Sequence, residues 1–357
     1  MESSMNARES LIRVIQSEDK KNIPFDIEIA ANSRSFYQDK LKGVPERQYF
    51  GSPVEHIRPN FLKAKQDTDF SRYYKEELPE NSFIDEWGIV TFVNEKGLTF
   101  HINPMKDMES SEDLTDYPFP DFSRKECYEH MNVQAAAIKS EGRLAIASAE
   151  KFIFAIGRDI RGYEKHLMDY YINEEFNEAL LDRALECQKA LVTGMATSGV
   201  DMLWLSSDVA SQDNVFLNPK KYHESVAWRM KEIFKTAKDA NPDILLAYHC
   251  CGNVLPIIDE FLEFGIDVLH PIQPESMDFN EVKKRCGGRL TLWGGISVQH
   301  TFPHGTPENI REEVRYASKI LGENGGYVVA PANTLTEDVP WENIEAFVDE
   351  AKKMWPY

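Results

Sequence analysis

The segment "ILLAYHCCGNVLPIIDEFLEFGIDVLHPI", residues 244–272, carries the pattern that decides the fold. It begins with an apolar run that stops at His249 and Cys251. A helical stretch over 256–265 follows, with a proline in its first turn and a glycine at its end, and a second apolar run then covers 266–272. A short buried strand, a helix and another buried strand are typical of a parallel sheet with helices on its faces.

The same alternation fills the C-terminal half of the chain. Strands are predicted over 199–207, 244–251, 266–272, 289–297 and 326–333, and helices over 218–241, 256–265, 278–288, 306–325 and 342–355. No strand leads into G-x-G-x-x-G or a P-loop, which argues against a doubly wound nucleotide-binding sheet. Polar or small residues follow nearly every strand, and chemistry spread over many strand ends is typical of a (β/α)8 barrel.

The earlier strands give a weaker signal. Residues 22–30 are predicted to form the first strand and 143–150 the third, while 81–104 alternates like a hairpin around 95–97. No linker or short-period repeat interrupts the chain. We therefore expect an α/β fold, a (β/α)8 TIM-type barrel with an N-terminal helical elaboration, in one domain over 1–357.

The charge balance excludes several classes of partner. Among 357 residues there are 40 Lys and Arg against 59 Asp and Glu, a formal net charge of -19. Nucleic acid and anionic membranes require basic surfaces, so neither is expected as a partner. No apolar run approaches the roughly 20 residues that span a bilayer, and the N-terminus has no signal-peptide pattern. The five cysteines are irregularly spaced and predict reduced thiols in the cytoplasm.

The end of the 244–251 strand is a candidate metal site. Side chains two residues apart in a strand share a face, so His249 and Cys251 are expected to point together and Cys250 to point into the helical layer. Imidazole nitrogen and thiolate sulfur are ligands that zinc prefers. Simple buried packing of the two side chains is the main alternative, and nucleophilic Cys-His catalysis is a weaker one.

Three motifs resemble one known superfamily. They are "HCCGNVLPIIDEFLEFGIDVLHPIQPESMD", "RLTLWGGIS" and "GGYVVAPANTLTEDVPWENI", with support from "IDEWGIVTF" and "DVASQDNVFLNPKKYHE". Together they are similar to the uroporphyrinogen decarboxylase superfamily from about residue 80 to the end. The resemblance implies a (β/α)8 barrel, in agreement with the strand pattern.

Two activities are implied by this superfamily. Its decarboxylases hold a polycarboxylate substrate with an arginine-rich N-terminal segment, where this chain has "DIEIAANSRSFYQDKLKG" with Arg34 alone. Its other branch comprises corrinoid-dependent methyltransferases. In the members of that branch that methylate a thiol, zinc is held by H-x-C and a later cysteine. His249 and Cys251 match the first two ligands, but Asn333 stands near the third position.

The third metal ligand therefore stays open. Glu150, Asp208 and Glu275 each lie near a predicted strand end and could supply an oxygen, with Asp208 best by position. Asp208 could instead cap a loop or helix, and the two glutamates could simply face water.

The resemblance implies a methyltransferase that moves a methyl group from a methyl ether or similar small substrate to the cobalt of a corrinoid-binding partner protein. Zinc would act as a Lewis acid on the atom that loses the methyl group. The predicted catalytic residues are Asp85 and Asp208, and the predicted substrate-binding residues are Glu86, Trp87, Gln273 and Asn333. The alternatives are a decarboxylase, a thiol-methylating enzyme and a non-catalytic binding barrel.

Overall fold

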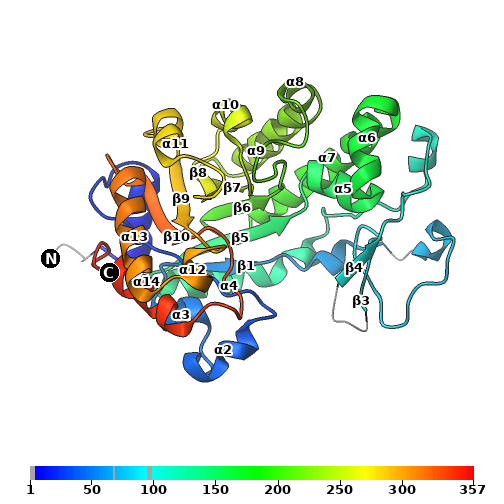
Figure 1. Ribbon diagram of the computed structural model, residues 1–357. Coiled ribbons are helices and arrows are strands. Elements are labelled where there is room, and N and C mark those ends of the chain that lie inside the picture. Colours follow the sequence, from blue (N-terminus) through cyan, green and yellow to red (C-terminus); the bar gives the residue numbers. More distant parts are fainter. Residues whose placement is uncertain (1–4, 67–68, 95–98) are drawn as a thin grey trace.

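The central element is a curled sheet of seven parallel strands surrounded by helices (Figure 1). The computed structural model describes residues 5–66, 69–94 and 99–357. The strand order is β1 (Val54–Ile57), β5 (Leu144–Glu150), β6 (Met202–Ser206), β7 (Leu245–His249), β8 (Val268–Ile272), β9 (Thr291–Ile296) and β10 (Tyr327–Pro331). Sequential strands are neighbours and all pairs are parallel, so the carboxyl ends of the strands meet at one rim.

The segment 22–30, predicted as the first strand, forms no continuous strand and lies beside the last strand through two isolated bridges. Parallel bridges join Phe25 to Val329 and Ile29 to Leu335, on the side of β10 away from β9. The predicted α/β fold of TIM type is confirmed. β1 was not predicted, because its four residues "VEHI" alternate too briefly to stand out from a loop.

Helices cover the outer face of the sheet. Those of the N-terminal elaboration are α1 (Ala7–Ile15), α2 (Arg34–Leu41) and α3 (Glu46–Phe50). Those that follow are α4 (Glu129–Ser140), α5 (Phe154–Arg161), α6 (Tyr163–Ile172), α7 (Glu174–Ala196), α8 (Pro219–Tyr222), α9 (Trp228–Ala240), α10 (Ile258–Glu263), α11 (Phe279–Cys286), α12 (Thr301–His304), α13 (Pro307–Leu321) and α14 (Trp341–Lys352). The five C-terminal strand-helix units are present as predicted.

A small antiparallel sheet stands to one side of the barrel in Figure 1. It consists of β2 (Phe83–Ile84), β3 (Val90–Val93) and β4 (Thr99–Ile102), in that order. β3 and β4 form the predicted hairpin, and its expected turn at 95–97 lies outside the described residues. No helix in the described part of the chain is long and apolar enough to cross a membrane. The assignment of 1–357 to one domain stays a prediction.

Continuous apolar runs place the later strands in the interior. Every residue of β8, β9 and β10 is buried, because one face of each strand packs inside the barrel and the other packs against helices. β6 and β7 are buried along most of their length, but their last residues, Ser206 and His249, are partly accessible. The rim of the barrel is therefore where the strands expose reactive side chains.

Candidate metal centre and adjoining cavities

His249, Cys251 and Asp208 converge at the rim. Their ligand atoms all lie within 4.8 Å of one another. His249 Nε2 lies 3.4 Å from Cys251 Sγ and 3.9 Å from Asp208 Oδ1. The backbone N–H of Cys251 donates to Asp208 Oδ1 at 2.8 Å, which orients this carboxylate toward the other two residues. One nitrogen, one sulfur and one oxygen form a donor set that fits zinc and leaves a fourth position open.

The neighbouring strand fixes the imidazole of His249. His270 on β8 pairs in register with His249, and the two Nδ1 atoms lie 2.7 Å apart. Burial lowers the pKa of both imidazoles, and for His270 the neighbouring His249 lowers it further, so both rings are neutral near pH 7. One Nδ1 then donates and the other accepts. If His249 donates, its Nε2 is the unprotonated nitrogen and faces Cys251, as a metal ligand requires.

The two adjacent cysteines have different surroundings. Burial and Asp208 raise the pKa of the Cys251 thiol to about 12, and the Asn333 amide lies 3.5 Å from its sulfur. Cys250 is fully buried, and its sulfur accepts from the N–H of Val209 at 3.4 Å. Cys250 therefore packs away from the group formed by His249, Cys251 and Asp208.

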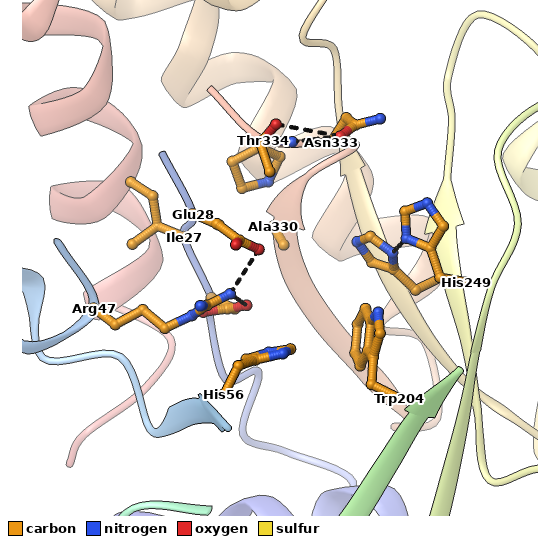
Figure 2. A pocket seen from close by; sticks show the side chains of 12 residues that line it. Ile27, Glu28, Arg47, His56, Trp204, His249, Ala330, Asn333 and Thr334 are labelled. Atoms are coloured by element: carbon orange, nitrogen blue, oxygen red, sulfur yellow. Dashed lines mark hydrogen bonds and ion pairs between the residues drawn. The ribbon is translucent and has the colours of Figure 1, made fainter. Parts of the chain in front are cut away.

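A small cavity of about 60 Å³, the central cavity, opens beside His249 inside the barrel (Figure 2). Trp204, His56 and Asn333 line it together with a charged cluster on its other side. In that cluster Arg47 Nε lies 3.0 Å from Asp26 and its Nη2 lies 3.0 Å from Glu28. These carboxylates raise the pKa of the Arg47 guanidinium although burial opposes them.

The predicted residues Asp85, Glu86 and Trp87 line a separate cavity of about 210 Å³, here called the aromatic cavity. Asp85 accepts from the N–H groups of Trp87 and Ile89 and lies 2.8 Å from Lys151 Nζ. Because its oxygens are already used in this way, Asp85 holds the loop together rather than facing the metal group.

Lys151 itself is held in an unusual conformation. Its φ of 65° is left-handed, and its carbonyl accepts a hydrogen bond from Gln188 at 2.9 Å. Such backbone conformations cost of order 1–3 kcal/mol and cluster at functional sites. The turn aims the ammonium group at Asp85.

The other predicted site residues lie around the rim but outside the metal group. Glu150 pairs with Arg58 at 2.7 Å, and both side chains are more than half exposed. Gln273 accepts from the N–H of Gly252 at 2.5 Å and so supports the loop that carries Cys251. Glu275 accepts from Ser297 and is not part of the group formed by His249, Cys251 and Asp208. Of the three candidate third ligands, only Asp208 joins His249 and Cys251.

Sequence reasoning missed several residues of the central cavity. His270 could have been found, because it lies within the predicted strand 266–272, next to β7, at the position that pairs with His249. Trp204 on β6, next to β7, and His56 on β1, two strands from β6, line the same cavity. The Arg47–Asp26 pair joins α3 to the segment 22–30 and has no local sequence signal.

Comparisons with known proteins place the chain in a family. Residues 109–354 match the family described as uroporphyrinogen decarboxylase (URO-D). A methylcobamide:CoM methyltransferase MtaA of Methanosarcina barkeri is 28% identical over 171 residues, which cover 48% of this chain and 47% of that protein. A methylated-thiol–coenzyme M methyltransferase of Methanosarcina mazei is 25% identical over 60% of this chain and 54% of its own length.

Decarboxylases also match, among them a uroporphyrinogen decarboxylase of Legionella pneumophila, 23% identical over 56% of this chain and 54% of its own. The chain thus spans about half the length of the curated relatives it matches. A solved structure described as a methyltransferase from Methanosarcina mazei aligns with a TM-score of 0.68 at 17% identity, covering 98% of this chain and 99% of that one. At this identity it shows the fold alone. The matched region exceeds half of the sequence, and the chain belongs to the uroporphyrinogen decarboxylase family.

Proposed function

We propose that this protein is a methyltransferase that moves a methyl group from a small methylated substrate to the cobalt of a corrinoid carried by a separate protein. The observation that carries the proposal is the convergence of His249, Cys251 and Asp208 at the rim of the barrel. The matched methyltransferases support the reaction class. Zinc held by these three residues would polarise the substrate atom that loses its methyl group.

The residues around the proposed metal have defined tasks. His270 orients His249, and the N–H of Cys251 orients Asp208. Asn333 lies against the Cys251 thiol. By the resemblance, a thiol-methylating enzyme would have a cysteine at this position. Asp208 then supplies the third ligand as an oxygen, which favours a substrate-demethylating enzyme over a thiol-methylating one.

The charges near the central cavity argue against decarboxylation of a polycarboxylate. Arg47 is buried and bonded to Asp26 and Glu28, and Arg34 pairs with Glu46 at 2.8 Å. Arg47 is therefore occupied by two carboxylates, and Arg34 already pairs with one, so neither is an uncompensated cation for a substrate carboxylate. The chain as a whole has a formal net charge of -19, which would repel an anionic porphyrinogen.

The test combines metal content with methyl transfer. The purified chain should contain zinc and should convert cob(I)alamin to methylcobalamin with a methylated substrate, which is followed by absorbance. His249→Ala and Cys251→Ala should lose zinc and lower the rate by more than the roughly 10–100-fold that loss of a supporting contact costs. A zinc-free protein whose variants keep full activity contradicts the proposal, and so does decarboxylation of uroporphyrinogen.

A further inference from the structure

The aromatic cavity contains a carboxyl group that has no cationic partner. Glu86 is only 9% exposed, makes no ion pair with any described residue, and has only its own backbone N–H as a hydrogen-bond donor. Two cationic side chains line the same cavity, but each already has a carboxylate partner. Lys151 pairs with Asp85 at 2.8 Å and Arg58 with Glu150 at 2.7 Å. Glu86 is therefore the one uncompensated acid among the described residues that line this cavity.

The remaining walls are mostly aromatic. Rings from three separate parts of the chain face the cavity: Phe61, Phe83, Trp87 and Phe122. Trp87 and Phe122 are almost fully buried and pack at a centroid distance of 5.9 Å. Aromatic faces attract cations, most strongly when water is excluded, and quaternary ammonium groups are recognised in this way.

We infer that the aromatic cavity binds the ammonium group of a small organic cation, through Glu86 and the aromatic rings around it. A volume of about 210 Å³ is below the range of drug-sized pockets and suits a compact head group. The charge of -19 on the chain also favours a cation over an anion. An anionic ligand would place a second negative charge beside Glu86, and a neutral ligand would leave its ionised form without a counter-ion.

The cavity lies close to the proposed metal group without touching it. Glu150, which lines the cavity, pairs in register with Ser206, and Ser206 pairs with His249. Two strand spacings, roughly 10 Å, therefore separate the backbone of Glu150 from that of His249. The ammonium group would therefore anchor the substrate, and its transferable methyl group would lie at the other end. This assignment of the cation as substrate rests on the proposed function, whereas the binding of the cation does not.

The pH dependence of binding follows from the surroundings of Glu86. The charged or titratable groups that face it are Asp85, Lys151, Lys65, Cys127 and, across the cavity, the pair of Arg58 and Glu150. Burial and the Asp85 carboxylate raise the pKa of Glu86 to about 7. The ionised form binds the cation, so affinity should rise with pH and fall about tenfold from pH 8 to pH 6.

Choline and its neutral isostere 3,3-dimethyl-1-butanol provide the test, with calorimetry as the readout. At pH 8, choline should bind at least tenfold more tightly than the isostere. Glu86→Gln keeps the shape of the side chain and should weaken choline binding at least tenfold. Glu126→Gln removes the same charge from an exposed position outside the cavity and should leave binding unchanged.

Three outcomes would overturn the inference: no choline binding, equal affinity for the isostere, or full affinity in Glu86→Gln. The comparison of choline with its isostere and the pH series use the unaltered protein, so the test does not depend on the folding of a variant. His249→Ala separates the two proposals. It should abolish methyl transfer while choline still binds, whereas failure of choline binding alone leaves the metal-centred function standing.

Discussion

The imidazoles of His249 and His270 meet through their Nδ1 atoms, which lie 2.7 Å apart. Because both rings are neutral, this contact sets which nitrogen of His249 carries a proton. A free Nε2 on His249 requires that His270 accept the hydrogen bond. The geometry of the proposed metal site thus depends on a side chain that is not itself a ligand.

His270→Phe should therefore weaken zinc binding by about 10–100-fold, the usual cost of removing a group that orients a metal-bound histidine. Phenylalanine keeps a ring of similar size but has no acceptor for His249. Affinity is measured by competition with a chromogenic chelator, and the melting temperature confirms folding.

His56→Phe is the matched control for that experiment. His56 is another imidazole on the same cavity, but its Nδ1 contacts Ser148 at 2.5 Å instead of His249. Its replacement should leave zinc affinity unchanged. Equal effects of the two substitutions would contradict a specific role for His270.

At the scale of elements, the turn after β7 carries Cys251 to the metal group. Gly252 ends this turn with a φ of +93°, and a Cβ atom there would lie 2.3 Å from the carbonyl oxygen of Ser211. Gly265, after α10, also has a left-handed φ of +75°, but a Cβ atom there would meet nothing within 4 Å. Substitutions at these two glycines therefore distinguish the cost of left-handed backbone from the cost of a steric clash.

Gly265→Ala should cost about 1–2 kcal/mol of unfolding free energy, the penalty of left-handed backbone alone. Gly252→Ala should cost more, because the backbone of Ser211 must also move. Since that movement displaces Cys251, only Gly252→Ala should weaken zinc binding. Urea denaturation and chelator competition measure the two effects. Unchanged zinc affinity in Gly252→Ala would show that the turn does not position Cys251.

Elements with a strong local pattern were predictable from the sequence, and those joined by distant contacts were not. The strands after residue 199 have continuous apolar runs, which predict them from the sequence. The predicted proximity of His249 and Cys251 is also present in the structure, although β7 ends at His249 and the following turn carries Cys251. β1 has four residues with mixed polarity and gives no such signal. Glu86 was expected to line the same pocket as His249, but in the structure it lines the aromatic cavity. The position of the loop before β3 depends on distant contacts, which a local sequence pattern does not reveal.

At the scale of the whole molecule, a charge cluster centred on Arg47 joins the segment beside β10 to the start of β1. Arg47 joins α3 to Asp26 and Glu28 of the segment 22–30, and Ser52, just before β1, also donates to Asp26 at 2.8 Å. The cluster therefore ties the segment beside β10 to the chain that leads into β1. β1 and β10 are the two edge strands of the seven-stranded sheet, so the cluster lies between its edges.

Arg47→Met should lower the unfolding free energy by about 3–5 kcal/mol at pH 7, because the Asp26 carboxylate stays buried without its partner. Arg229→Met is the control. Arg229 is equally buried, but its partners Glu178 and Asp182 are 40% and 59% exposed, so water can solvate them and the loss should be smaller.

The pH dependence of the Arg47→Met effect identifies the buried carboxylate as its cause. Burial raises the pKa of Asp26, but Arg47 outweighs burial and holds that pKa below its ordinary value. In the native protein this stabilisation is therefore present above about pH 4 and is lost as the pH falls through the lowered pKa. Without Arg47, burial is opposed only by His56 and by the Ser52 hydrogen bond, so the pKa of Asp26 rises and protonation relieves the penalty on acidification. The difference in unfolding free energy between native protein and variant should shrink from pH 7 to pH 4 in urea titrations. A difference that is constant with pH would assign the loss to packing of the arginine side chain instead of its charge.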